Sequence, residues 1–253
     1  MTQLSRPSIF PQPGWAWRNK PELWVLGGVF FAAAMILAFG HIAEEVTEGD
    51  ATKFDQTVLL ALRNPADLSD PIGPAWLEEA ARDITSLGSY VVLGFVLCAV
   101  LAYLVMTQKR AAALWISASV GGGVVLSNAL KFAFERPRPE IVPHAVRVFT
   151  SSFPSGHATL AAVSYLTLGA LLASLHSSRQ LKLYFISVAI FLTVAIGLSR
   201  LYLGVHYPTD VLAGWCVGAA WAALCWMIAW WLQARGTIEP PQVDAIGDES
   251  HDG

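Results

Sequence analysis

Six long apolar runs constrain this chain more than any other feature of its sequence. An α-helix rises 1.5 Å per residue, so about 20 apolar residues cross a hydrocarbon layer about 30 Å thick. Backbone groups inside lipid must be satisfied within their own segment, so each run is predicted to be a helix. The runs cover residues 24–43, 88–107, 111–130, 157–175, 183–199 and 211–232. The sequence therefore predicts an all-α fold, a bundle of six transmembrane helices.

The composition argues against a water-soluble globule. Of the 253 residues, 55% are hydrophobic and 14% are charged, whereas a soluble domain carries roughly a quarter charged residues. Ten Trp and 12 Phe are consistent with aromatic belts at the membrane interfaces. The net charge of −3, without a basic cluster, gives no electrostatic support for nucleic-acid binding. The expected partners are the bilayer and a lipid substrate, and no feature specifies an oligomeric state.

Composition divides the chain into three parts. Residues 1–23 are expected to form a cytoplasmic N-terminal segment, and residues 24–232 the membrane domain. The run 24–43 is interpreted as a retained transmembrane helix, because it is longer than the apolar region of a usual signal peptide. After Arg235 the chain has five acidic residues and no Lys or Arg, so residues 233–253 are predicted to be a disordered acidic tail.

A polar stretch separates the first two apolar runs. Within it, Phe54, Val58, Leu59 and Leu62 recur at helical spacing, which predicts a short amphipathic helix on the membrane or over the bundle. Two roles stay open for this helix. A packing element is the favoured one, and a lid over a lipid entrance is the alternative.

The number of Lys and Arg residues on each side of the membrane gives a weak orientation. With the N-terminus inside, each side carries eight. Setting aside Lys131, Arg138 and Arg200 as residues held for chemistry leaves eight inside and five outside, which places both termini in the cytoplasm. Successive spans cross the membrane in alternating directions, whichever way the first one runs. The third and fifth helices therefore end on the same face of the membrane on which the fourth and sixth begin. That face is predicted to be extracytoplasmic, or periplasmic, on the inner or plasma membrane.

Three cations gather at these four helix ends: Lys131, Arg138 and Arg200. Charges near a membrane are costly and usually functional. In the same segments only Asp210 and Glu135 could neutralise them. The missing anion is most simply a ligand, and phosphate fits best, because Arg offers a forked donor to phosphate oxygens and Lys a point charge.

The fourth helix begins with a second feature suited to phosphate. Ser155 and Gly156 precede it, and helix N-terminal amides favour an anion while Gly permits close backbone approach. The sequence shows no Asp, Glu or His cluster typical of a magnesium or zinc site. We therefore expect no metal and no cofactor, with the Lys and Arg side chains supplying the charge stabilisation.

Two histidines and an aspartate complete the constellation. His206 and Asp210 are four residues apart, so on one helix face the carboxylate can orient the imidazole for attack on phosphorus. His157 is expected to protonate the leaving oxygen and later to activate water. Taken singly, each residue also has a structural interpretation, as a snorkelling cation, a helix cap or an interfacial polar pair.

Three motifs together resemble the type 2 phosphatidic acid phosphatase superfamily of membrane lipid phosphate phosphatases. They are Lys131 with Arg138-Pro139, then Pro154 to His157, and Ser199-Arg200 with His206 and Asp210. The resemblance implies a six-helix bundle, a metal-independent mechanism with His206 as nucleophile, and substrates such as phosphatidic acid, phosphatidylglycerophosphate or undecaprenyl diphosphate. Vanadium-dependent haloperoxidases share the site pattern, but the six spans argue against that assignment.

These observations favour a hydrolase that acts on a lipid phosphomonoester or diphosphate at the outer leaflet through a phosphohistidine. One alternative is a lipid phosphotransferase, which would pass the same phosphoryl group to another hydroxyl. The other is a non-catalytic lipid-phosphate binder or transporter. The complete His-Asp-His set argues against that alternative, because binding needs cations but no nucleophile, and the sequence also lacks the internal repeat common in transporters.

Overall fold

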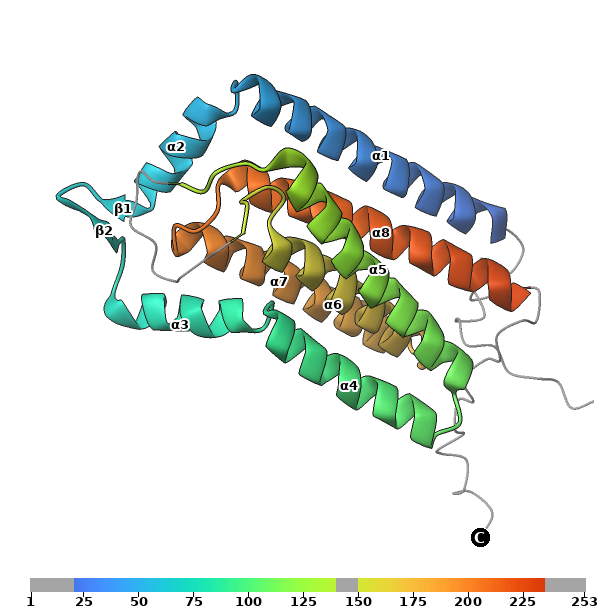
Figure 1. The fold of residues 1–253 in the computed structure, drawn as a ribbon. Helices are drawn as coiled ribbons and strands as arrows, with labels where there is room; N and C mark the ends of the chain where they lie inside the picture. Colours follow the sequence, from blue (N-terminus) through green and yellow to red (C-terminus); the bar gives the residue numbers. More distant parts are fainter. Residues whose placement is uncertain (1–20, 140–149, 235–253) are drawn as a thin grey trace, which may run out of the picture.

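The structure, a computed structural model, describes residues 21–139 and 150–234 and is drawn in Figure 1. The described residues form helices apart from one small hairpin and the connecting loops. The predicted cytoplasmic segment and acidic tail lie outside the described residues, except that α1 begins at Pro21 and α8 continues to Ala234. The elements are α1 (Pro21–Glu48), α2 (Thr52–Ala61), β1 (Arg63–Asn64), β2 (Asp67–Pro71), α3 (Ala75–Ser86), α4 (Tyr90–Met106), α5 (Arg110–Phe134), α6 (Gly156–Ser174), α7 (Arg179–Tyr202) and α8 (Pro208–Ala234).

The predicted six-span helical bundle is confirmed. Five helices, α1, α5, α6, α7 and α8, are individually long and apolar enough to cross a membrane. The sixth candidate span is the pair formed by α3 and α4, which meets the same criteria when the two helices are taken together and is bent by 48° at the break between them. Two of the helices continue past the predicted apolar runs, so that Lys131 lies in the last turn of α5 and Arg200 in the last turn of α7. These added turns carry two of the predicted site cations.

Helix α6 forms the centre of the bundle and packs against α5, α7 and α8. Small residues permit the closest of these contacts. A Cβ added at Gly218 would lie 2.6 Å from the carbonyl oxygen of Thr159, and one at Gly214 would lie 2.8 Å from that of Ser155. Such close backbone approach is typical of helix packing in membranes. It brings the N-terminal ends of α6 and α8 together.

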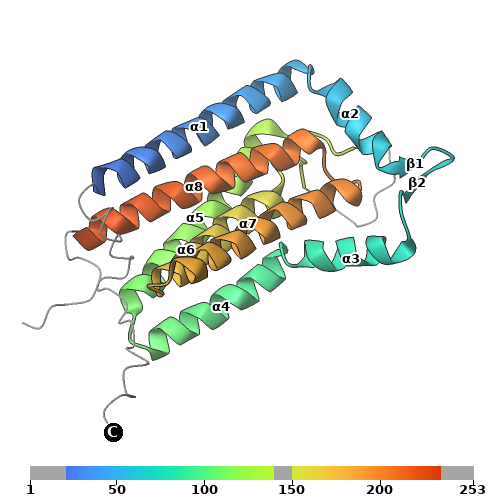
Figure 2. The same ribbon diagram turned by 180° about the vertical axis from the view of Figure 1, so that it is seen from behind.

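Helix α1 lies at the edge of the bundle, side by side with α8, as the two opposite views in Figures 1 and 2 show. Most of its side chains are exposed, including Phe30 and Leu37. Apolar side chains in this position face the hydrocarbon of a bilayer and need no protein partner. Helix α1 therefore contributes mainly a membrane anchor and a wall for α8.

The stretch between α1 and α4 contains more structure than the single helix predicted for it. Helix α2 confirms that helix, while the antiparallel β1–β2 hairpin and α3 were not anticipated. All of them lie at the end of the bundle where α8 begins (Figure 1). The buried positions of α2 are Asp55 and Leu59, whereas Phe54 of the predicted apolar stripe is 52% exposed. A carboxylate on the inward face of α2 indicates a polar partner beneath it.

Candidate active site

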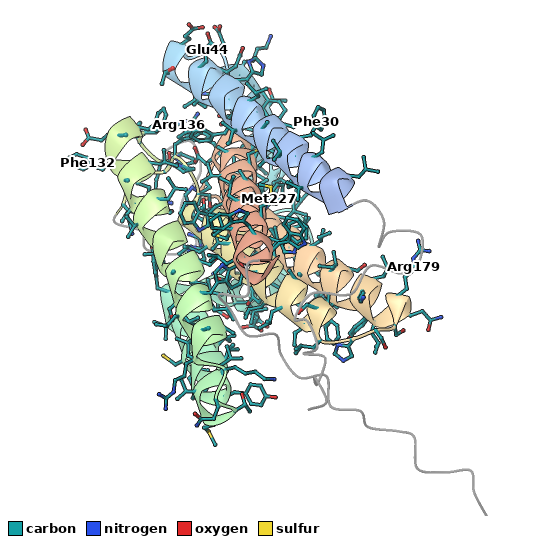
Figure 3. All side chains as sticks on the ribbon, turned by 90° about the vertical axis from the view of Figure 1, so that its right-hand side faces the viewer. Phe30, Glu44, Phe132, Arg136, Arg179 and Met227 are labelled. Carbon is teal, nitrogen blue, oxygen red and sulfur yellow. The ribbon has the colours of Figure 1, made fainter. Side chains whose placement is uncertain are left out.

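The four helix ends predicted to share one membrane face, the ends of α5 and α7 and the starts of α6 and α8, lie together in the structure. They carry Lys131 at the end of α5, Ser155 to His157 at the start of α6, Arg200 at the end of α7, Asp210 in the first turn of α8, and Arg138 and His206 in the adjoining loops. Figure 3 shows Arg136 and Glu44 at this end, and Arg179, at the start of α7, at the opposite end. The cations and histidines chosen from the sequence therefore share one end of the bundle.

His206 and Asp210 form a buried pair. Asp210 Oδ2 lies 3.2 Å from His206 Nδ1, and the two side chains are 1% and 0% exposed. A carboxylate oxygen can only accept, so Nδ1 carries the proton and donates it. On the other side of the ring, Arg138 Nη1 lies 3.0 Å from Nε2, and a guanidinium can only donate. Asp210 and Arg138 assign the same tautomer, with the lone pair of Nε2 facing Arg138.

The surroundings of His206 keep its imidazole neutral. Burial lowers the pKa of His206, and the positive charges of Arg138, Arg200 and Lys131 lower it further. The two effects differ in origin but act in the same direction, because burial removes the water that would solvate a charged ring and the cations repel its positive charge. A neutral imidazole with a free lone pair is the form that can attack phosphorus.

The three predicted phosphate-binding cations have neutral hydrogen-bond partners among the described residues. Lys131 Nζ donates to Ser151 O at 2.7 Å, Arg138 Nε to Thr150 O at 2.8 Å and Arg200 Nη1 to Thr85 Oγ1 at 3.0 Å. Within residues 21–139 and 150–234, no carboxylate lies within 4.0 Å of any of these three cations. Buried Nε of Arg200 has no hydrogen-bond partner there either. Three cations without counter-charges form a strong attractor for an anion.

Helix α6 begins at Gly156, with Ser155 as its N-cap, at the place predicted from the sequence. Ser155 is fully buried, and its Oγ accepts a hydrogen bond from Ala158 N at 3.4 Å, so it caps its own helix. Its backbone N donates to Asp210 O at 2.9 Å, which ties α6 to α8. A Cβ at Gly156 would lie 3.2 Å from Lys131 Cε. Gly156 therefore lets the lysine side chain lie close to the start of α6.

His157 occupies the first turn of α6 and is partly exposed. Among the described residues, neither of its ring nitrogens has a hydrogen-bond partner, so both are available to a bound molecule. The break between α3 and α4 lies against this ring, because a Cβ added at Gly88 would be 3.3 Å from His157 Cδ2 and 2.5 Å from Ile196 Cγ2. Gly88 is a residue of the site that the sequence interpretation missed.

Arg136 and Asp55 were also missed. Arg136 Nη1 lies 2.6 Å from Asp210 Oδ1 and Nη2 lies 2.7 Å from Asp55 Oδ2, while its guanidinium carbon lies 4.3 Å from the centre of the Tyr207 ring. Burial alone lowers the pKa of Arg136, but Asp210 and Asp55 outweigh burial and raise it. The available signal was a carboxylate interrupting the apolar face of α2, which requires a cation when buried.

Metal binding has no visible basis in the part of the chain that the structure describes. Within residues 21–139 and 150–234, no three His, Cys, Asp or Glu side chains are grouped so that they could hold a metal ion. The expectation of a metal-free site remains a prediction for experiment.

Comparison with known proteins agrees with this geometry. The family model of the PAP2 superfamily matches residues 112–234. Phosphatidylglycerophosphatase B of Bacillus subtilis is 35% identical over 146 residues, 56% of this chain and 70% of that protein. Decaprenylphosphoryl-5-phosphoribose phosphatase of Mycobacterium tuberculosis is 30% identical over 149 residues, 57% of this chain and 76% of that protein.

A solved structure shares the fold. The crystal structure of the transmembrane PAP2 type phosphatidylglycerolphosphate phosphatase from Bacillus subtilis superposes with a TM-score of 0.73 at 27% identity, and the match covers 80% of this chain and 98% of that one. The resemblance that the three motifs suggested is thus confirmed over most of the membrane domain. The chain belongs to the PAP2 superfamily.

Proposed function

We propose that this membrane phosphatase removes a terminal phosphate from a lipid phosphomonoester or diphosphate by way of a phosphohistidine on His206. The observation that carries the proposal is the placement of His206 Nε2. Its lone pair points to Arg138, one of three cations that have no carboxylate partner in the described structure. A nucleophile that faces cations able to bind a phosphate is the arrangement that phosphoryl transfer requires.

Substrate binding would rearrange Arg138. In the structure Arg138 Nη1 donates both to Val205 O at 2.7 Å and to His206 Nε2. Nε2 cannot attack while its lone pair accepts that hydrogen bond. A phosphate offers Arg138 stronger, charge-assisted acceptors, so the arriving substrate draws the guanidinium away and uncovers the nucleophile. Lys131 and Arg200 would bind the remaining phosphate oxygens, beside the amides that begin α6.

The chemistry then follows in two displacements. Nε2 forms a bond to phosphorus as the bond from phosphorus to the lipid oxygen breaks. His157 must be protonated for this step, because it gives that oxygen a proton and becomes neutral. Asp210 stabilises the positive charge that develops on the His206 ring through its hydrogen bond to Nδ1. Neutral His157 then takes a proton from water, whose oxygen attacks phosphorus, and the bond to Nε2 breaks to release inorganic phosphate.

The two relatives described above support a substrate with a phosphate on a lipid, because their names specify a phospholipid and a polyprenyl-linked sugar phosphate. We propose phosphatidylglycerophosphate, phosphatidic acid and undecaprenyl diphosphate as the candidates to compare first. Residues 24–232 would form the phosphatase unit. The balance of Lys and Arg favours a site on the extracytoplasmic face, with both termini in the cytoplasm.

The direct test is release of inorganic phosphate by the purified full-length protein in detergent, with each lipid phosphate and with EDTA present. We expect activity to persist in EDTA and His206→Ala to abolish it. The matched control is His41→Ala, because His41 is an exposed histidine on α1. Activity lost in EDTA would overturn the metal-free mechanism, and an active His206→Ala protein would remove His206 as nucleophile.

A phosphotransferase would use the same intermediate and differ only in the acceptor. The two activities are distinguished by supplying labelled substrate together with glycerol and measuring how the label divides between inorganic phosphate and glycerol phosphate. A hydrolase gives mostly inorganic phosphate. A predominance of glycerol phosphate would assign the chain to transfer instead.

A further inference from the structure

Asp55 is a fully buried carboxylate on α2, outside the residues 112–234 that the family model matches. Its two oxygens have different partners. Oδ1 accepts from Thr209 N at 3.0 Å, and Oδ2 accepts from Thr209 Oγ1 at 2.7 Å and from Arg136 Nη2 at 2.7 Å. Burial of a carboxylate is costly unless it is paired and hydrogen-bonded, and here both conditions are met at the start of α8.

Arg136 connects this carboxylate to the site. Its Nη1 donates to Asp210 Oδ1 at 2.6 Å and to Thr209 Oγ1 at 2.9 Å. The other oxygen of Asp210, Oδ2, accepts from His206 Nδ1 and from Tyr207 N at 2.9 Å. The two oxygens of Asp210 thus serve separate partners, Arg136 on one side and the imidazole on the other.

This division depends on Asp55, for a geometric reason. An arginine facing a single carboxylate prefers to bind it with both terminal nitrogens, which uses both carboxylate oxygens. Because Asp55 holds Nη2, Arg136 presents only Nη1 to Asp210. If Nη2 were released, the guanidinium could turn to bind Asp210 through both oxygens, and His206 Nδ1 would then lose its acceptor.

We propose that Asp55 is a positioning residue for His206, acting through Arg136 and Asp210. The inference rests on the proposed phosphatase function. It makes α2 a working part of the site, since this helix keeps Oδ2 of Asp210 available to the imidazole. The segment between α1 and α4 then tunes turnover without touching the phosphate.

The variant Asp55→Asn tests this, because it keeps the shape of the side chain and removes its charge. We expect kcat for phosphate release to fall roughly 10- to 100-fold, the loss typical of a reacting group displaced by about 1 Å. KM should change less than about twofold, because Asp55 contacts none of the three phosphate-binding cations. The control is Asp50→Asn, the same change at an exposed aspartate just before α2, and it should leave kcat and KM unchanged.

A double-mutant cycle with Asp210→Asn separates positioning from general loss of structure. If Asp55 acts through Asp210, adding Asp55→Asn to Asp210→Asn should lower kcat by less than about threefold, because residues that act as one unit are strongly non-additive. Losses that multiply in full would overturn the proposal. An unchanged kcat in the single variant Asp55→Asn would also overturn it, and in both cases the phosphatase function would stand. A wild-type protein that releases no phosphate would overturn the function and this inference together.

Thr209→Val provides a second route if Asp55→Asn does not fold. Valine has the shape of threonine, so only the hydroxyl that joins Asp55 Oδ2 and Arg136 Nη1 is removed. We expect kcat to fall about threefold to tenfold, because the hydroxyl's two hydrogen bonds, to Asp55 Oδ2 and from Arg136 Nη1, are lost, with KM unchanged. Wild-type kcat in Thr209→Val would contradict the proposed network.

Discussion

Arg136 and Arg138 are two residues apart in one loop, yet their guanidinium groups meet opposite surroundings. Arg136 binds two buried carboxylates, and their charges raise its pKa although burial opposes this. Arg138 donates to backbone carbonyls, to the hydroxyl of Thr150 and to the imidazole of His206, and burial lowers its pKa. On the proposed function, the cation paired with two carboxylates organises the site, whereas the cation without a carboxylate partner among the described residues binds the phosphate.

The same contrast divides the whole end of the bundle. His206 Nδ1 donates to Asp210 of α8, which Arg136 links to Asp55 of α2. Arg138 lies at Nε2 on the other side of the ring, and the charges of Lys131 and Arg200 also lower the pKa of His206. The imidazole therefore lies between two groups of charges. In the first, here called the filled network, Arg136 pairs with Asp55 and Asp210. The second, here called the unfilled network, consists of the cations without carboxylate partners among the described residues: Lys131, Arg138 and Arg200. Variants of the unfilled network should lose mainly turnover, whereas variants of the filled network should lose stability as well as turnover.

The largest effect is expected from the unfilled network. Arg138→Met should lower kcat/KM about 1000-fold or more, the usual scale for an arginine that stabilises transferring phosphoryl groups. Its free energy of unfolding should change by less than about 1 kcal/mol, because no buried charge loses its partner. Kinetics in detergent and SDS titration in mixed micelles measure the two quantities. Arg138→Lys, which keeps the charge without the fork, should retain more activity, and a fully active Arg138→Met would contradict the comparison.

Arg136→Met should lower the free energy of unfolding much more than Arg138→Met does. It leaves Asp55 and Asp210 buried without the cation that pairs with both, so we expect a loss of about 3–5 kcal/mol in the free energy of unfolding. The double variant Arg136→Met with Asp55→Asn removes one stranded charge and should recover part of that loss. The same SDS titration measures both. If Arg136→Met were as stable as Arg138→Met, the distinction between the two arginines would fail.

The pH dependence sharpens the role of the unfilled network. His206 must be neutral to attack, so activity falls as pH drops through its pKa. Burial and the cations lower that pKa, so the acid limb of kcat/KM should lie below the ordinary histidine value of about 6.5. Lys131→Gln removes one of those cations and should move the limb upward. The same substrate is used for both proteins, so that its own ionisation cancels from the comparison. A limb that stays in place would show that Lys131 does not act on His206.

Much of this arrangement could be predicted from the sequence, because its signals are local. The spans follow from apolar length, and the cations and histidines lie at helix ends in short motifs. The contacts of Arg136 are not local, since its carboxylate partners are 74 and 81 residues away along the chain. Asp55 is one of ten acidic residues between positions 44 and 85; it interrupts the apolar face of α2, but its partners follow only from the contact of α2 with α8. The hairpin and α3 were missed because they have no long apolar run.

The smallest effect is expected from an ion pair that has the same N–O distance as the pair of Arg136 and Asp210 but lies on the exposed surface of α3. Arg82 Nη2 lies 2.6 Å from Glu78 Oε1 on the surface of α3, the distance found between Arg136 and Asp210. Water solvates both partners once the pair is broken, so Arg82→Ala should change the free energy of unfolding by about 0.5 kcal/mol or less and leave kcat/KM unchanged. SDS titration beside Arg136→Met tests whether burial or distance sets the strength of these pairs. Equal losses in the two variants would mean that distance decides, and the filled network would then be no different from an ordinary surface pair.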